Sequence, residues 1–194
     1  MIGEDQGVPR RWAATIEGDV VILDIDADRY FLGVAGESSR RGQGAAAKAA
    51  HSPGTKAWSM PTRTLGPSGR TRAILAVNAV NCLLTVAHVL KHRTFAELVD
   101  RVDTAKAARS PGAWPAQELV ASFAAIRPFV RQARICRLDA PALCILFRRY
   151  GHDARLVFGV RLRPFAAHCW AQLDDAAIIE APEDLRQYTP ILAI

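Results

Sequence analysis

The chain has 194 residues, half of them apolar and 23% charged, and its 25 lysines and arginines against 19 aspartates and glutamates give a net charge of +6. This is the composition of a globular protein with a sizeable core, and it excludes the fibrous and intrinsically disordered classes. The first residues include Glu4 and Asp5 with no apolar run behind them, so they match no secretory signal and we expect a cytoplasmic protein.

Three short β-prone runs open the chain, at residues 12–15, 20–25 and 29–34, and polar turns separate them. Gly33 suits an edge strand or bulge better than a central strand. Three strands alone are marginally stable, so we expect helices from later in the chain to cover them.

A basic stretch follows at residues 38–72, which contain no Asp or Glu and are rich in Gly, Ser, Ala and Pro. Its basic residues are Arg40, Arg41, Lys48, Lys56, Arg63, Arg70 and Arg72. Such a stretch can attract nucleic acid or an acidic peptide. No aromatic stacking pattern accompanies it, so we favour a solvated basic linker and expect no nucleic-acid partner.

Helical patterns follow at residues 73–92 and 115–133, the second with a kink at Pro128. In the first, Asn78, Asn81, Thr85 and His88 recur at steps of three and four and predict one polar stripe. We expect Ile74, Val77 and Leu84 to face elsewhere. The stripe argues against a membrane span, although the run is nearly long enough for one.

The segment from Cys136 onward reads as a helix ending at Gly151, then strands at residues 154–161, 166–173 and 176–181. Asp174 and Asp175 mark the turn between the last two strands, which gives an antiparallel meander. With a break at residues 110–112, the chain divides into an N-terminal module and linker (1–72), a helical connecting segment (73–110) and a C-terminal domain (111–194).

Four cysteines, at irregular spacings, are expected as free thiols rather than as a disulfide framework. They are Cys82, Cys136, Cys144 and Cys169. No CxxC pair occurs, so we predict no metal site.

Cys136, His168 and Glu180 together suggest a catalytic triad. A thiol becomes a strong nucleophile when a base or a helix N-terminus favours its thiolate, and a third group holds the base in the right tautomer. The order helix-Cys, strand-His, strand-acid occurs in papain-like and transglutaminase-like thiol enzymes. The alternative for Cys136 is a buried structural thiol.

The length of the hairpin loop decides whether Glu180 can be the third member. A three-residue loop at residues 173–175 places Glu180 directly opposite His168, with Cβ atoms roughly 5 Å apart. A two-residue loop turns it to the other face, where it is an exposed edge carboxylate. Cys169 should face away from His168, and Cys144 lies two turns along the helix, so neither is expected to act as the nucleophile.

The run ICRLDAPALCILFRRYGHDARLVFGVRLRPFAAHCWAQLDDAAIIEAPED and the closing YTPILAI resemble the leader-peptidase (B) proteins of lasso-peptide biosynthesis. The shared pattern is a Cys opening a helix, then Gly, a strand and His-x-Trp, and it covers roughly residues 134–194. Upstream, GDVVILDIDADRYFLG resembles the small winged-helix peptide-recognition element of these proteins.

The resemblance implies an α+β protein, with a three-stranded winged-helix-like module and a transglutaminase/papain-like helix and antiparallel sheet. It implies a cysteine protease with Cys136 as nucleophile, His168 as general base and Glu180 at the acid position. The implied partners are a lasso precursor peptide and an asparagine-synthetase-like macrolactam synthetase, through which ATP would be required; no directly bound cofactor is implied. The leader would add as a strand at Arg29, Tyr30, Phe31, Leu32 and Val34.

Two residues depart from the family pattern. Pro141 stands where a helix-compatible residue is usual, so either the helix begins near Asp139, with Cys136 in the preceding loop, or its first turn is distorted. Gln172 replaces a usual acidic residue. Two other functions stay open: acyl transfer to an amine, and a non-catalytic escort that binds a peptide.

Overall fold

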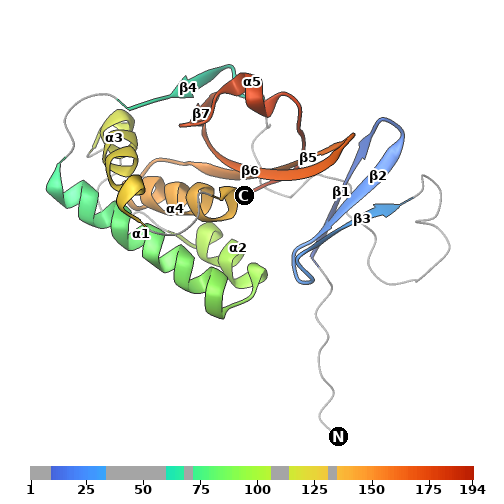
Figure 1. The fold of residues 1–194 in the computed structure, drawn as a ribbon, viewed down its shortest axis with the longest axis horizontal. Coiled ribbons are helices and arrows are strands. Elements are labelled where there is room, and N and C mark those ends of the chain that lie inside the picture. The colour runs from blue at the N-terminus through green and yellow to red at the C-terminus, as the bar shows by residue number, and fades with distance from the viewer. Residues whose placement is uncertain (1–9, 34–59, 68–71, 106–113, 131–134) are drawn as a thin grey trace, which may run out of the picture.

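The protein is described here by a computed structural model that covers residues 10–33, 60–67, 72–105, 114–130 and 135–194 (Figure 1). Its N-terminal part is a three-stranded antiparallel sheet in the order β1-β2-β3. The strands are β1 (Arg11–Ile16), β2 (Asp19–Asp24) and β3 (Arg29–Gly33). They agree with the predicted runs to within one residue at each end, and Val34 lies outside the described residues.

One face of this N-terminal sheet is buried against the rest of the chain. Val21 and Leu23 of β2 point inward with the alternation expected of a strand, and with Ile25 they are fully buried in the same core as the helices. Two ion pairs bridge the same contact: Arg10 with Asp100 at 2.5 Å and Arg137 with Asp28 at 2.8 Å. The prediction is therefore only partly confirmed: later helical segments contribute Asp100 and Arg137, but the strand at residues 189–193 is the main neighbour of this sheet, through β1.

Four α-helices lie on one side of the second sheet, and the last of them in the chain packs directly against it (Figure 1). They are α1 (Ala73–His92), α2 (Phe95–Asp103), α3 (Ala116–Ile126) and α4 (Cys136–Arg149), with a 3₁₀ turn, η2 (Arg127–Phe129), after α3. The bounds of α1 are those predicted, and the predicted kink of the second helix is the change from α3 to η2 at Pro128.

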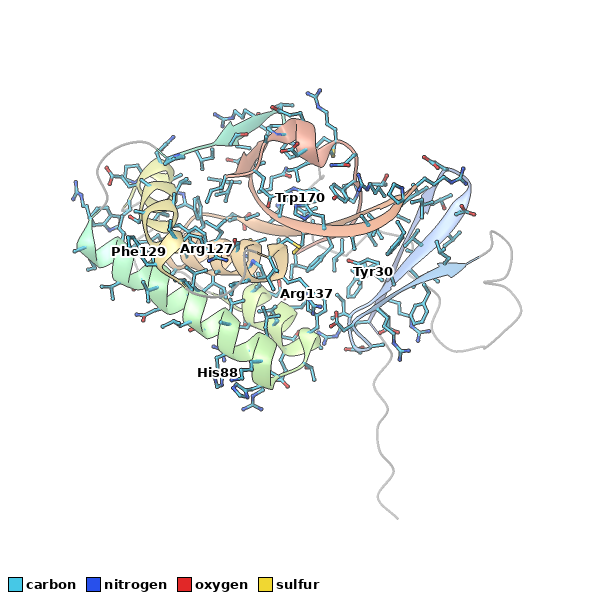
Figure 2. All side chains as sticks on the ribbon, viewed as in Figure 1. Tyr30, His88, Arg127, Phe129, Arg137 and Trp170 are labelled. Carbon is cyan, nitrogen blue, oxygen red and sulfur yellow. The ribbon has the colours of Figure 1, made fainter. Side chains whose placement is uncertain are left out.

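The face assignment within α1 was wrong. Ile74, Val77 and Leu84 are about half exposed and share the outer side of the helix with His88, which points outward in Figure 2. Helices α3 and α4 instead cover the side formed by Leu75, Ala79, Cys82, Leu83, Val86 and Val89. Because apolar residues occur almost all round α1, the polar stripe alone could not fix which side is buried.

Helix α1 is also long and apolar enough to cross a membrane, alone among the described helices. Its most apolar window has a mean hydropathy of 2.0 and is 33% buried within the protein. A core helix meets the same criteria, so this length and composition are weak support for a span.

The second sheet is mixed, in the order β4-β7-β6-β5-β8. Its strands are β4 (Arg63–Leu65), β5 (Arg155–Leu162), β6 (Phe165–Leu173), β7 (Ala176–Ile178) and β8 (Thr189–Ala193). The predicted meander forms β5, β6 and β7, and β4 adds to it in parallel with β7. The linker prediction is therefore wrong for residues 63–65, which form β4, and residues 38–59 and 68–71 lie outside the described residues.

The second sheet lies between two buried clusters, and the strand that carries His168 of the candidate site contacts both of them. Helix α4 packs on one face, within the main core. Trp170 of β6 lies on the opposite face with Leu185 of α5 (Pro182–Leu185) (Figure 2). Strand β6 therefore contacts the α4 side and the α5 side through alternate residues.

Candidate active site

Cys136 is the first residue of α4, and Ile135 is its N-cap. The backbone N–H groups of Leu138 and Asp139 both donate to the Ile135 carbonyl, so the first turn is formed. The expectation of a helix start near Asp139 is wrong: Pro141 is accommodated as the sixth residue of the helix. The thiol of Cys136 therefore lies at a helix N-terminus, where the backbone dipole favours a thiolate.

A nearly buried ion pair fixes this end of α4. The Arg127 guanidinium, which is 5% exposed, donates from Nε to Asp139 at 2.5 Å and from Nη1 to the Val130 carbonyl at 3.1 Å. Asp139 is in the first turn of α4, where a carboxylate also interacts favourably with the helix dipole. The turn after α3 thus holds the helix start that carries Cys136.

His168 lies on β6 beside the carboxylate of Glu180. Its Nε2 is 2.6 Å from a carboxylate oxygen of Glu180, which leaves Nδ1 for the Cys136 thiol, its other hydrogen-bond partner. The imidazole also stacks at 6.2 Å on Trp170 and packs at 5.2 Å against the Tyr188 ring. These contacts restrict the ring to the orientation that bridges the thiol and the carboxylate.

Glu180 reaches His168 although it does not continue β7 as a regular strand. The register pairs Gln172 with Ala177 and Leu173 with Ala176, so the loop has two residues, and the three-residue loop was wrong. A regular strand would then turn Glu180 away from His168. Strand β7 ends at Ile178, however, and Ile179 has a φ of +74°, which redirects the chain toward His168.

Strand β4 holds this irregular segment in place. The Ile179 N–H donates to the Leu65 carbonyl at 3.1 Å, and the Thr64 hydroxyl donates to the Glu180 carbonyl at 3.0 Å. A positive φ is costly for a β-branched residue and persists only where its surroundings enforce it. The strand within the predicted linker therefore positions the carboxylate.

Cys169, which was not expected to act as the nucleophile, lies in the site beside Cys136. It faces the α4 side of β6, as expected for the neighbour of His168, and it is 2% exposed. It lines the same pocket as Cys136, and hydrogen bonding from its side chain and its backbone is among the causes that lower the pKa of the Cys136 thiol. The only sequence signal was its position beside His168 in the His-x-Trp motif.

The electrostatics favour an ionised Cys136–His168 pair. Hydrogen bonds from Cys169 and His168 outweigh burial and lower the pKa of the Cys136 thiol to about 4. Burial alone would lower the pKa of His168, but its hydrogen bonds to Cys136 and Glu180 raise it to about 10. The site is therefore a thiolate beside an imidazolium.

The other described cysteines do not have this reactivity. Burial raises the pKa of Cys82 to about 11 and that of Cys144 to about 12. The hydrogen bond to Cys136, together with burial, raises the pKa of Cys169 well above its usual range. These three thiols stay protonated at neutral pH.

A pocket of about 260 Å³ opens beside the Cys136 sulfur. Its lining combines the N-terminal sheet with the helix and strand of the triad, at Asp28, Tyr30, Phe95, Cys136, Arg137, Phe158, Ala167, His168 and Cys169. Figure 2 shows Tyr30 and Arg137 at the junction of these two parts. The Arg137 guanidinium lies over the Phe95 ring at 4.4 Å and forms an ion pair with Asp28. The charges of Arg137 and Asp28 in the pocket lining therefore neutralise each other.

The predicted peptide-binding residues divide between this pocket and the open edge of β3. Tyr30 faces the pocket, where its ring meets Phe165 edge-on at 6.0 Å. Phe31 is 38% and Leu32 67% exposed, and the Arg29 guanidinium lies 5.9 Å from the Phe31 ring. Among the described residues β3 pairs only with β2, so it is one of the two edge strands of its sheet.

A comparison with known protein families matches residues 76–193 to the transglutaminase-like superfamily. The matched region is more than half of the chain and includes most of α1, all of α2 and all three members of the candidate triad. Neither the search of curated proteins nor the search of solved structures returned a match.

Proposed function

Because this chain belongs to the transglutaminase-like superfamily, we propose that it is a cysteine protease that removes the leader from a lasso-peptide precursor. The superfamily fold is consistent with both cysteine peptidases and acyl transferases. The observation that carries the proposal is the convergence of Cys136, His168 and Glu180 at the start of α4, with His168 and Glu180 2.6 Å apart.

In the proposed mechanism the Cys136 thiolate attacks the carbonyl carbon of the scissile peptide bond. His168 gives its proton to the departing amine, which leaves a thioester on Cys136. His168 then takes a proton from water, the resulting hydroxide attacks the thioester, and the acid product leaves. Glu180 orients His168 and stabilises its positive charge. The Cys136 N–H, in the first turn of α4, supplies one oxyanion donor.

The position of β3 supports a peptide as the substrate. An outer strand offers unpaired backbone groups to which an extended peptide can add as a further strand. Tyr30 of this same strand lines the pocket beside Cys136. A leader docked along Arg29, Tyr30, Phe31 and Leu32 would therefore run next to the nucleophile.

The identity of the substrate rests on the resemblance of residues 134–194, and of the N-terminal strands, to lasso leader peptidases. The same resemblance proposes the macrolactam synthetase as partner, with ATP used by that enzyme, and a cytoplasmic location. Because Cys136 opens α4 despite Pro141, the main motive for a non-catalytic escort is weakened.

Incubation with the small precursor encoded beside this protein tests the proposal, with and without the synthetase. Hydrolysis yields leader and core peptides whose masses add to that of the precursor plus one water. Transfer to an amine would instead give a leader whose mass exceeds that of the free acid by the mass of the amine minus one water, and this would favour the acyl-transferase function. An intact precursor under both conditions would contradict both enzymatic functions.

A further inference from the structure

The edge of β6 is open where the nucleophile approaches it. Among the described residues, β7 pairs with β6 only at Gln172 and Leu173. The backbone of His168 and Cys169 is therefore left without a neighbouring strand on that side. Cys136, the first residue of α4, lines one pocket together with His168 and Cys169, and α4 packs against β6.

Cys136 thus contacts two side chains that point to opposite faces of β6. His168 lies on the face of Trp170, and Cys169 lies on the face covered by α4. All three residues line the same pocket. Because Cys169 is 2% exposed, ionising it would bury a charge, so it is the protonated partner of the two thiols and the donor between them.

We propose that Cys169 is a positioning residue for the nucleophile, and that its thiol and its backbone N–H both donate hydrogen bonds that hold the Cys136 sulfur as a thiolate. In this arrangement His168 supplies the proton for the leaving amine, while Cys169 stabilises the ionised sulfur from the other side. The pKa of the Cys136 thiol, lowered first of all by the Cys169 side chain, supports this division. The importance of Cys169 for catalysis rests on the proposed function, but its effect on the thiol does not.

The test is the pH dependence of Cys136 alkylation by iodoacetamide, followed by peptide mass spectrometry without substrate. The inflection is the pH at which the alkylation rate of Cys136 is half of its maximum. We expect Cys169→Ala to raise this pH by about one unit or more, because one charge-assisted hydrogen bond is lost. Cys169→Ser keeps a donor and should move it less. The matched control is Cys144→Ala. Cys144 is another buried thiol, on the same helix as Cys136, and its removal should leave the inflection unchanged.

Folding is checked by circular dichroism at each pH, and Cys169→Val, which has no donor, replaces the alanine variant if that variant does not fold. A folded Cys169→Ala or Cys169→Val protein with the wild-type inflection would overturn the inference. Alkylation and cleavage are separate measurements, so the two proposals can fail separately. If the alkylation midpoint of Cys136 depends on Cys169 but the protein cleaves no leader, only the proposed function is overturned.

Discussion

The three residues of the candidate triad come from α4, from β6 and from the irregular segment after β7, and a different local feature holds each of them. Cys136 lies at a helix N-terminus, the His168 ring packs against Trp170 and Tyr188, and Glu180 follows a residue with positive φ. The coupling between thiolate and imidazolium favours the ionised pair from about pH 4, where the thiol ionises, to about pH 10, where the imidazolium loses its proton.

Glu180→Gln tests the role of the carboxylate. Glu180 raises the pKa of His168 by its hydrogen bond and its charge, so its removal should lower that pKa. We expect the alkaline limb of kcat/KM to move to lower pH by about one unit or more. The acid limb, which reports the thiol, should move less. The control is Glu183→Gln, an exposed carboxylate of α5. An unchanged alkaline limb would contradict the assignment of Glu180.

At the scale of elements, the regular parts of the fold could be predicted and the parts that depend on tertiary pairing could not. The periodicity of α1 gave its bounds, and alternating runs gave β1, β2 and β3. Strand β4 has three residues and forms only because β7 pairs with it. Helix α2 did carry a local signal, since Thr94 accepts from the Glu97 N–H as a cap, but it was included in a general helical segment.

The candidate site was predictable to a similar degree. Cys136 and His168 follow from residue order. The place of Glu180 was predicted through a loop length that does not occur, since the positive φ of Ile179 cannot be read from a strand pattern. The contact of Cys169 with Cys136 depends on the open edge of β6, which only the pairing of β7 determines.

Gly159 tests how the sheet positions His168. It is the cross-strand partner of His168, and a Cβ placed there would lie 2.9 Å from the Trp170 ring and 3.2 Å from Tyr188. Gly159→Ala should displace the two rings that contact His168 and reduce the free energy of unfolding by about 1–3 kcal/mol. Denaturant unfolding measures the loss of stability, and kcat measures the effect of the displaced rings on His168.

The control for this substitution is Gly66→Ala, because a Cβ at Gly66 meets no atom within 4 Å. Equal stability and equal kcat in the two variants would show that the packing of Trp170 and Tyr188 does not hold the catalytic histidine.

At the scale of the whole molecule, the N-terminal sheet shares its core with the triad-bearing part and supplies a wall of the pocket beside Cys136. The Asp28–Arg137 pair and the buried residues of β2 hold β3 near α4. This arrangement links the proposed docking of a leader to the position of the cleavage site.

Leu32→Lys tests this link, because Leu32 is 67% exposed on the open edge of β3. Loss of one apolar contact should weaken binding of a fluorescent leader peptide roughly tenfold. Alkylation of Cys136 should be unchanged. Leu84→Lys, a 50% exposed site on α1, is the matched control and should bind normally. Equal dissociation constants for both variants would place the leader elsewhere.

Cleavage of the precursor by the Cys136→Ala protein tests the central claim most directly, with Cys144→Ala assayed beside it. The proposed mechanism predicts that product peptides disappear for Cys136→Ala and persist for Cys144→Ala, since Cys144 is a fully buried thiol away from His168. Cleavage at the wild-type rate by a folded Cys136→Ala protein would contradict it.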